Sequence, residues 1–335
     1  MRIWFNQGHT LYQSLRDMET RVPGVTLLVS AKNPMSPAAL AGSETWADPQ
    51  NMESAEYARW TLDQAVARDV DVFFPQKEVM AIADIADEFE KAGIRLELPG
   101  EASVIRLLDD KAAMAADLEG DDILAPTIRA SSSDEVAAAV ARIRSMGVEA
   151  CVKPSHGVFA QGYWHLVDDD LLDCLDDIRS RRMPLATYLE AVAAADRQGR
   201  PIDLIVMEHL PGTEASVDMH VRNGEVLRAV TRVKVKGSRQ LIVGGHELVE
   251  IAGRLAARYR LNGVINVQFK PDAKEKWRIL EINPRMPGGL SYAMPLGVDL
   301  AADWVRVATG GRVEPVADSF SRMVNFYTES TIRTD

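Results

Sequence analysis

"WRILEINPRMPGG", residues 277–289, is the stretch that decides the fold. It begins as an apolar strand, in which side chains two positions apart point to the same side. Glu281 and Asn283 therefore share one face with Ile279. Polar side chains without partners are costly to bury, so this pattern predicts a ligand against them. A hard cation such as Mg²⁺ is the first candidate, because it prefers carboxylate and carbonyl oxygens.

The composition is that of an ordinary globular protein. The chain has 335 residues, 47% of them apolar and 26% charged, a length that allows about two domains. Its net charge of −11 without a basic cluster argues against nucleic-acid binding. It has no apolar run near the ~20 residues of a membrane span, no signal-peptide core at its start, and only Cys151 and Cys174 as cysteines. We expect a cytoplasmic protein that contacts neither nucleic acid nor membrane.

Strands and helices alternate over the first hundred residues. Apolar strands are expected at 2–5, 25–30, 70–75 and 94–98, with helices up to about residue 21 and at 55–69 and 78–93. This alternation predicts a parallel, doubly wound α/β sheet of the Rossmann-like kind. Ligands of such sheets bind beyond the carboxyl ends of the strands, where residues 6–9 and 32–36 lie.

The rest of the chain mixes strands and helices without strict alternation, which favours an α+β unit. Pro99-Gly100 marks a boundary, and Asn223-Gly224 predicts the turn of a β-hairpin. Strands are expected at 150–155, 162–167, 263–272 and 276–285, and helices at 171–200, with a break near Pro184, and at 245–261. We predict domains at residues 1–100, 101–207 and 208–335.

Gln268 extends the polar face of residues 281–283, provided that its strand pairs with theirs. One carboxylate and two carboxamides would then hold a cation that needs further anionic ligands, which nucleotide phosphates supply. The alternative is an ordinary polar face on an edge strand.

Two lysines and an acidic linker could complete a nucleotide site. Lys153 ends a strand and leads into a small loop of Ser155, His156 and Gly157, whose N–H groups can close over a phosphate. Lys111 lies on a predicted helix, where a solvated lysine is the alternative. The linker "MEHLPGTE", residues 207–214, offers backbone groups to a purine and the Glu214 carboxylate to a ribose.

The order of these motifs resembles the ATP-grasp superfamily. The stretches that carry the resemblance are "DDKAAM", "CVKPSHG", "MEHLPGTEASVD", "NVQF" and "LEINPR", within residues 104–310. The last two look most like the carbamoyl phosphate synthetase large subunit and its single-module relatives, and residues 1–100 look like the domain that precedes the ATP-grasp fold.

The resemblance implies ATP held between two α+β subdomains, with a role for each matching residue. Lys111, Lys153, Ser155, His156 and Gly157 would contact phosphates, and residues 155–161 would form a lid. Adenine would face Glu208, His209 and Leu210, and ribose would face Glu214. Gln268, Glu281 and Asn283 would hold two Mg²⁺ ions, with Mn²⁺ as a substitute. Arg285 and Lys153 would be catalytic, Arg285 by stabilising the transferred phosphoryl group or the substrate carboxylate.

The hypothesis that follows is an ATP- and Mg²⁺-dependent ligase. It would join a small carboxylate to an amine or thiol through an acyl phosphate, as a stand-alone biosynthetic enzyme. The alternatives are a small-molecule kinase and a non-catalytic ATP-binding regulatory protein on the same fold. Arg232, Lys234 and Lys236 alternate onto one strand face, which is either an anion site or solvated. The tail, residues 312–335, either extends a sheet or forms a homodimer contact.

Overall fold

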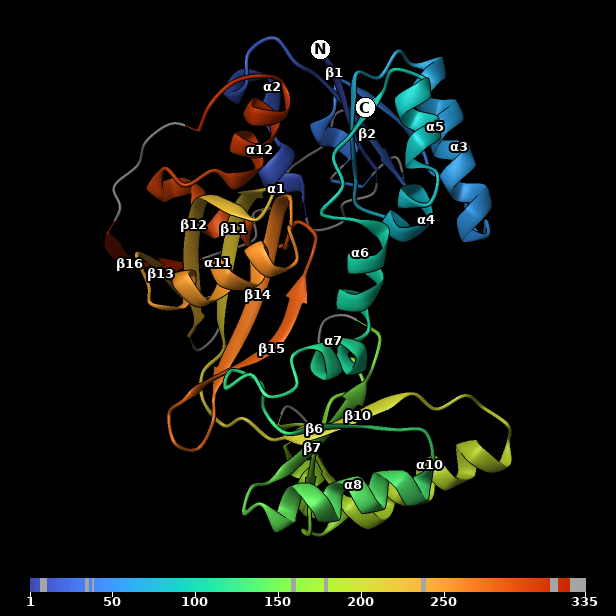
Figure 1. Ribbon diagram of the computed structural model, residues 1–335, viewed down its shortest axis with the longest axis vertical. Helices are drawn as coiled ribbons and strands as arrows, with labels where there is room; N and C mark the ends of the chain where they lie inside the picture. The colour runs from blue at the N-terminus through green and yellow to red at the C-terminus, as the bar shows by residue number, and fades with distance from the viewer. Residues whose placement is uncertain are drawn as a thin grey trace. The chain divides into compact units, whose positions relative to one another are not determined.

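The chain folds into two units, one of which is assembled from three separate segments. The first unit comprises Met1–Ile105, Glu214–Gln268 and Ile282–Asp335, and the second comprises Arg106–Thr213 and Phe269–Glu281. Figure 1 shows the computed structural model. It describes residues 1–6, 11–33, 36–37, 39–157, 161–177, 180–235, 239–313 and 319–325. Part of the predicted ligand edge (residues 7–9 and 34–35), Lys236 and the end of the tail lie outside the described residues.

A five-stranded parallel sheet forms from the alternating amino-terminal pattern, as predicted. Its spatial order is β3-β2-β1-β4-β5. The strands are β1 Arg2–Asn6, β2 Thr26–Ala31, β3 Glu44–Ala47, β4 Val72–Pro75 and β5 Arg95–Leu96. Strand β3 was not predicted, because its residues are mostly exposed and lack an apolar alternation.

The helices of this region cover the sheet. They are α1 Tyr12–Leu15, α2 Met18–Arg21, α3 Ser54–Ala67, α4 Val79–Ala83 and α5 Ala86–Lys91, with a 3₁₀ turn at Ala39–Ala41. The single helix predicted at 78–93 is therefore two short ones. One face of the sheet packs Trp4 and Phe73 against Tyr57 of α3 and Phe89 of α5. The other face is closed from far along the chain by α12, Leu300–Ala308.

Trp304 of α12 is the side chain that joins the two ends of the chain in one core. Its ring lies edge-on to Phe74 at 4.8 Å and to Phe5 at 6.3 Å, measured between ring centroids. It is 4% exposed. Two short 3₁₀ turns, Leu290–Tyr292 and Met294–Leu296, precede α12.

Asn6, at the end of β1, lies where the strand order reverses between β1 and β4. Its side chain is fully buried and accepts hydrogen bonds from the Gln76 and Lys77 amides at 2.6 and 3.3 Å. It donates to the Tyr57 hydroxyl and the Lys77 carbonyl, both at 3.1 Å. Asn6, at the predicted ligand edge, thus links the end of β1 to α3 and to the segment that follows β4.

A six-stranded sheet follows, with the order β15-β14-β11-β12-β13-β16. Its strands are β11 Ala215–Arg222, β12 Glu225–Lys234, β13 Arg239–Gly244, β14 Gly263–Pro271, β15 Trp277–Asn283 and β16 Phe320–Asn325. The predicted hairpin turn is confirmed, since Asn223 and Gly224 both have left-handed φ values of 49° and 81°. Helix α11, Leu248–Arg258, matches the predicted helix. The tail supplies β16, which extends the sheet beside β13.

The second unit contains a five-stranded sheet in the order β6-β10-β7-β8-β9. Its strands are β6 Thr127–Ala130, β7 Ala150–Pro154, β8 Trp164–Val167, β9 Arg182–Pro184 and β10 Leu204–Glu208. Its helices are α7 Lys111–Asp117, α8 Ser133–Ser145, α9 Leu171–Asp176 and α10 Leu185–Arg197, and α6, Ala102–Asp109, leads into it. The predicted break near Pro184 is in fact strand β9, which pairs with β8. No helix in the described part of the chain has the length and apolar character needed to cross a membrane.

Candidate active site

Lys111 is buried at the start of α7, contrary to the alternative of a solvated lysine. Its Nζ donates to the Gly157 carbonyl at 2.9 Å and lies 3.9 Å from Glu281 Oε2. Its side chain is only 10% exposed, and that of Glu281 is 20% exposed. Lys111, Gly157 and Glu281, which were predicted to share a site, are thus brought together within the second unit.

Asp110 holds this corner in place. Its carboxylate caps α7 by accepting from the amides of Ala112 at 2.9 Å and Ala113 at 3.2 Å. It also accepts a hydrogen bond from the Ser155 hydroxyl, while the Lys111 amide donates to the Ser155 carbonyl at 3.0 Å. Burial opposes its ionisation, but the hydrogen bonds from Ser155 and the helix amides hold the pKa of Asp110 below its usual value. Ser155 therefore fastens α7 to the end of β7.

Lys153 reaches the same strand as Glu281. Its Nζ donates to the carbonyl of Leu280 at 3.4 Å. Two lysines from different elements therefore meet adjacent positions of β15. His156 lies beside Asp203, with its Nδ1 3.3 Å from Asp203 Oδ2. Residues 158–160 of the predicted lid lie outside the described residues.

An apolar surface adjoins the lysines at the end of β10. Leu210 and Met207 belong to a buried cluster with Ala112 and Cys151, against which the half-buried Leu280 packs. Glu208 is 5% exposed, and burial followed by the charge of Asp272 raises the pKa of its carboxyl. The adenine contact that the resemblance implies for Glu208 and Leu210 stays a prediction.

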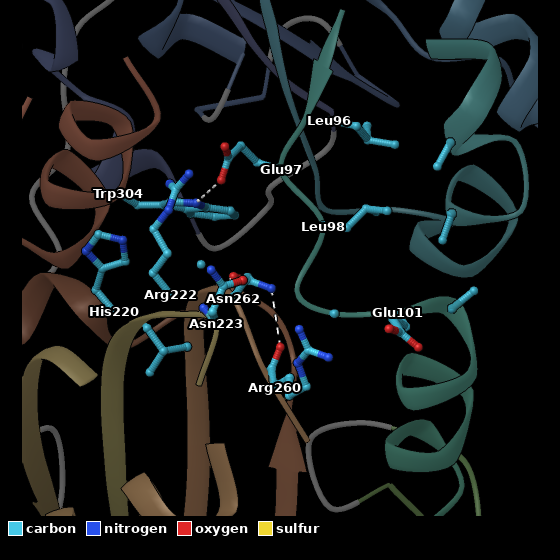
Figure 2. Close-up of a pocket in the computed structure, with 16 residues that line it drawn as sticks. Leu96, Glu97, Leu98, Glu101, His220, Arg222, Asn223, Arg260, Asn262 and Trp304 are labelled. Carbon is cyan, nitrogen blue, oxygen red and sulfur yellow. Dashed lines mark hydrogen bonds between the residues drawn. The ribbon is translucent and has the colours of Figure 1, made fainter. Parts of the chain in front are cut away.

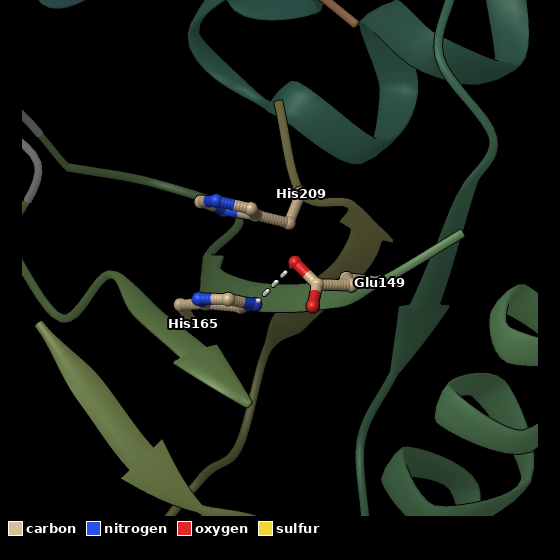
Figure 3. A group of neighbouring side chains, drawn as sticks. All are labelled: Glu149, His165 and His209. Atoms are coloured by element: carbon tan, nitrogen blue, oxygen red, sulfur yellow. Dashed lines mark ion pairs between the residues drawn. The ribbon is translucent and has the colours of Figure 1, made fainter. Parts of the chain in front are cut away.

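His209 lies in a cluster that the sequence did not indicate (Figure 3). Its ring stacks on His165, with centroids 3.8 Å apart and planes inclined by 7°, and its Nδ1 is 2.8 Å from the Tyr163 hydroxyl. His165 Nε2 lies 3.2 Å from Glu149 Oε2. Burial, followed by the neighbouring His165, lowers the pKa of His209 to about 4.

The stacked histidines do not form a ready metal site, although ligand atoms of Glu149, His165 and His209 lie within 4.8 Å of one another. A metal ion binds an imidazole nitrogen in the plane of its ring. Two nearly parallel rings 3.8 Å apart have no shared point in both planes. The cluster instead fixes the orientation of His209.

Gln268, Asn283, Arg285 and Glu214 belong to the first unit, unlike the other predicted site residues. Strands β14 and β15 are neighbours in the sheet, which confirms the pairing that the prediction for Gln268 required. Asn283 Nδ2 donates to Asn266 Oδ1 at 3.3 Å, and its own Oδ1 accepts from Arg285 at 3.4 Å. Asn283 and Arg285 are therefore brought together.

Asp218 and Asn266 are polar residues of this region that the motif comparison did not identify. Asp218 is completely buried and receives two hydrogen bonds from the Arg232 guanidinium. Asn266 donates to Asp218 Oδ1 at 2.8 Å and accepts from Asn283. A continuous chain of hydrogen bonds thus leads from Arg232 to Asn283, which we call the Asp218 network. In the sequence Asp218 alternates with Glu214, and Asn266 alternates with Gln268. This shared strand face was the feature that could have pointed to both residues.

The strand face of Arg232 and Lys234 is buried at one residue and exposed at the other, since the Lys234 side chain is 56% exposed. Arg232 is 6% exposed and is paired with Asp218, while its Nη1 donates to Gln240 at 2.9 Å. Lys234 forms an ion pair with Glu214 at 2.6 Å, so the predicted ribose ligand has a cationic partner.

Gly289 has a steric role beside Arg232. A Cβ atom at this position would lie 2.3 Å from Arg232 Nη1 and 2.5 Å from its Cζ. A side chain at this position would force the guanidinium to shift from its place beside Asp218. This explains one of the two glycines that follow the "LEINPR" stretch.

Comparison with solved structures identifies this architecture as the ATP-grasp fold, as predicted, with its α/β and α+β parts. N5-carboxyaminoimidazole synthetase from Staphylococcus aureus is 13% identical, with a TM-score of 0.66 over 93% of this chain and 78% of that one. Biotin carboxylase from Campylobacter jejuni is 14% identical, with a TM-score of 0.66 over 95% and 73%. The biotin carboxylase domain of 2-oxoglutarate carboxylase from Hydrogenobacter thermophilus is 17% identical, with a TM-score of 0.65 over 94% and 71%.

A family model narrows the likeness within that fold. The model described as "ATP-grasp in the biosynthetic pathway with Ter operon" matches residues 200–329. The chain thus has the ATP-grasp fold, and its residues 200–329 match an ATP-grasp family model. No curated protein matches it in sequence. The closer likeness to carbamoyl phosphate synthetase remains a prediction, as do the roles of the individual site residues.

Proposed function

We propose that the chain is an ATP- and Mg²⁺-dependent ligase that joins a small carboxylate to an amine or thiol. The observation that carries the proposal is the meeting of Lys111, Lys153 and Glu281. Two buried or half-buried lysines contact adjacent residues of β15, one at the carbonyl of Leu280 and one near the Glu281 carboxylate. A nucleotide phosphate beside a metal-binding carboxylate would offer further anionic oxygens to both lysines.

Gln268, Glu281 and Asn283 fit Mg²⁺ by the chemistry of their donors. All three offer oxygen atoms, which a hard cation prefers, and none offers sulfur or imidazole. With a single full negative charge among them, the metal would need phosphate oxygens as further ligands. When bound, Mg²⁺ would supply charge neutralisation at the phosphates. Two ions are expected, and Mn²⁺ could replace them.

The proposed reaction has two steps that need no protein nucleophile. A carboxylate oxygen of the substrate attacks the γ-phosphorus of ATP, the bond to the β-phosphate oxygen breaks, and ADP leaves. The amine or thiol then attacks the acyl carbon and displaces inorganic phosphate, losing its proton to solvent. Positioning and charge neutralisation provide most of the acceleration in such transfers. Lys153 and Arg285 would stabilise the charge of the transferred group, and the Asp218 network would hold Asn283 in its orientation.

Structures similar to this chain support the proposal because several of them contain bound nucleotides. A structure of the Staphylococcus aureus synthetase is described as complexed with ADP. The Campylobacter jejuni structure is a β-γ-ATP complex, and the Hydrogenobacter thermophilus structure holds MgADP and bicarbonate. The family description names a biosynthetic pathway. A biosynthetic ligase that acts on small molecules agrees with all of these.

Calorimetric titration with ATP, with and without Mg²⁺, tests the site first. We expect Mg²⁺-dependent binding to the wild type and its loss in Glu281→Gln. Glu250→Gln is the matched control, because Glu250 lies on the exposed face of α11 and pairs with Arg254 of the same helix. A folded wild type that does not bind ATP would exclude the ligase.

Product analysis then identifies the reaction. A ligase releases ADP and phosphate only when both acceptors are present. A kinase leaves the phosphoryl group on a single acceptor, and a non-catalytic binder consumes no ATP. Screening pairs of small acids and amines for phosphate release therefore separates the three functions.

A further inference from the structure

A cavity of about 530 Å³ lies within the first unit, and none of the proposed ATP and metal ligands belongs to its lining (Figure 2). Its walls are Ala83 and Ala86 at the junction of α4 and α5, the segment from the end of β5 to the start of α6 (96–102), the end of β11 with the hairpin turn, residues 260–263 before β14, and Trp304 of α12. The volume is within the range of about 300–1,000 Å³ found for small-molecule sites.

The walls are tied together by hydrogen bonds that need no ligand. Asn262 donates its amide to the Pro99 carbonyl at 2.8 Å, and its Oδ1 accepts from the Asn223 amide at 2.7 Å. The Trp304 indole donates to Glu97 Oε2 at 3.0 Å. Gly263 has a φ of 77°, and a Cβ there would lie 2.7 Å from the Trp304 ring. The cavity is therefore preformed.

His220 brings an unsatisfied polar atom to this cavity. The residue is 1% exposed, and its Nδ1 has no hydrogen-bond partner within the described part of the chain. Burial, followed by the charges of Arg222 and Arg228, lowers the pKa of His220 to about 4. A neutral imidazole with an unpaired buried nitrogen is costly, and its ring is part of the cavity lining.

Charges of opposite sign come from different segments of the lining. Glu97 and Glu101 come from the segment after β5, whereas Arg222 and Arg260 come from the end of β11 and the loop before β14 (Figure 2). The side chains of Arg222, Arg260 and Glu101 make no hydrogen bond or ion pair with any described residue. Trp304, with the leucines of the 96–102 segment, adds apolar surface.

We propose that this cavity binds a small zwitterion, an α-amino acid or a dipeptide. Its carboxylate would lie against Arg222 and Arg260, and its ammonium group against Glu97 and Glu101. A lone anion would meet two carboxylates, and a lone cation would meet two guanidinium groups, so only a molecule with both charges matches both walls. The inference does not depend on the proposed ligase function.

Calorimetry on the full chain without ATP tests the proposal. The probes are L-leucine and L-leucyl-L-leucine, compared with L-leucinamide, N-acetyl-L-leucine and inorganic phosphate. We expect a zwitterion to bind and each analogue that lacks one charge to bind about tenfold or more weakly. Arg222→Gln and Glu101→Gln should weaken zwitterion binding by a similar factor. Arg254→Gln, a surface change on α11 outside the cavity, should leave it unchanged.

Three results would overturn the proposal. One is that neither zwitterion binds the wild type. Another is that a singly charged analogue or phosphate binds as tightly as the zwitterion. The third is that Arg254→Gln weakens binding as much as Arg222→Gln. Circular dichroism of each variant checks the fold, and a separate ATP titration keeps the outcome distinct from that of the ligase proposal.

Discussion

Replacing Gly289 by alanine isolates the contribution of the buried Arg232–Asp218 pair. Gly289 has φ −92° and ψ 6°, a conformation that alanine adopts without strain. The new Cβ would nevertheless lie 2.3 Å from Arg232 Nη1, so the guanidinium must move. The side chains of Arg232 and Asp218 are 7% and 0% exposed. If the pair separates, water therefore cannot readily replace either partner.

The expected cost is about 3 kcal/mol of unfolding free energy. Removing one partner of a buried ion pair costs about 3–5 kcal/mol, and the lower end applies because Asn266 still donates to Asp218. Hydrogen exchange measured by mass spectrometry on peptides of β11 and β12 reports this loss within the first unit. About 3 kcal/mol corresponds to exchange about 10²-fold faster.

A double-mutant cycle checks the cause. Leucine at position 232 ends at its δ carbons, two bonds short of the Cζ that the new methyl group would meet. In an Arg232→Leu background, Gly289→Ala should therefore cost less than about 1 kcal/mol. Gly100→Ala is the control, because its Cβ would meet nothing closer than 3.6 Å. An equal cost of Gly289→Ala in both backgrounds, or a negligible cost in the wild type, would refute the reasoning.

Three further predictions concern single side chains. Glu281→Gln should lower ATP-dependent phosphate release about 10²-fold, because the proposed metal site loses its only carboxylate, and an unchanged rate would exclude that role. His220 remains neutral in the fold down to about pH 4 but is protonated below 6.5 when unfolded, so its contribution to stability is complete above pH 6.5 and falls by about 3 kcal/mol towards pH 4. Denaturant titrations at each pH should show that His220→Gln lacks this loss, and equal pH slopes in both proteins would contradict it. Asp110→Ala removes the cap of α7 and the acceptor of Ser155, and should cost about 1–2 kcal/mol, seen as faster hydrogen exchange in α7. Unchanged exchange there would show that the cap is not needed.

Local patterns predicted most of the fold because they report on individual strands and turns. The alternation of the first hundred residues predicted the parallel sheet. Asn223-Gly224 predicted the β11–β12 hairpin of the six-stranded sheet, because few other residue pairs accept two left-handed conformations. Strand β9 was missed because its three residues become a strand only by pairing with β8. Such a strand depends on a partner elsewhere in the chain.

The sequence motifs predicted which residues belong to the candidate site. They did not predict whether a residue is buried, because burial depends on contacts with distant parts of the chain. The Lys111 motif pointed to the right residue, but its burial beside Glu281 depends on a contact across 170 positions of sequence. Asp218 reads in the sequence as one more polar residue on an alternating strand. Its complete burial follows from Arg232 on the adjacent strand and from Asn266, which strand register brings together.

The position of Trp304 in the core has a consequence for how the protein is made. During synthesis the first hundred residues emerge long before α12 exists, and the sheet face that carries Phe5 and Phe74 is then covered in part by α1 and α2 but lacks Trp304. An apolar face of this kind attracts other chains until it is closed. This apolar face of the first sheet therefore stays partly exposed while some two hundred further residues are synthesised. The whole first segment of the second unit is among them. A ribosome that stops before residue 300 would release a protein prone to aggregate, and chaperone binding to the early chain should persist until α12 has been synthesised.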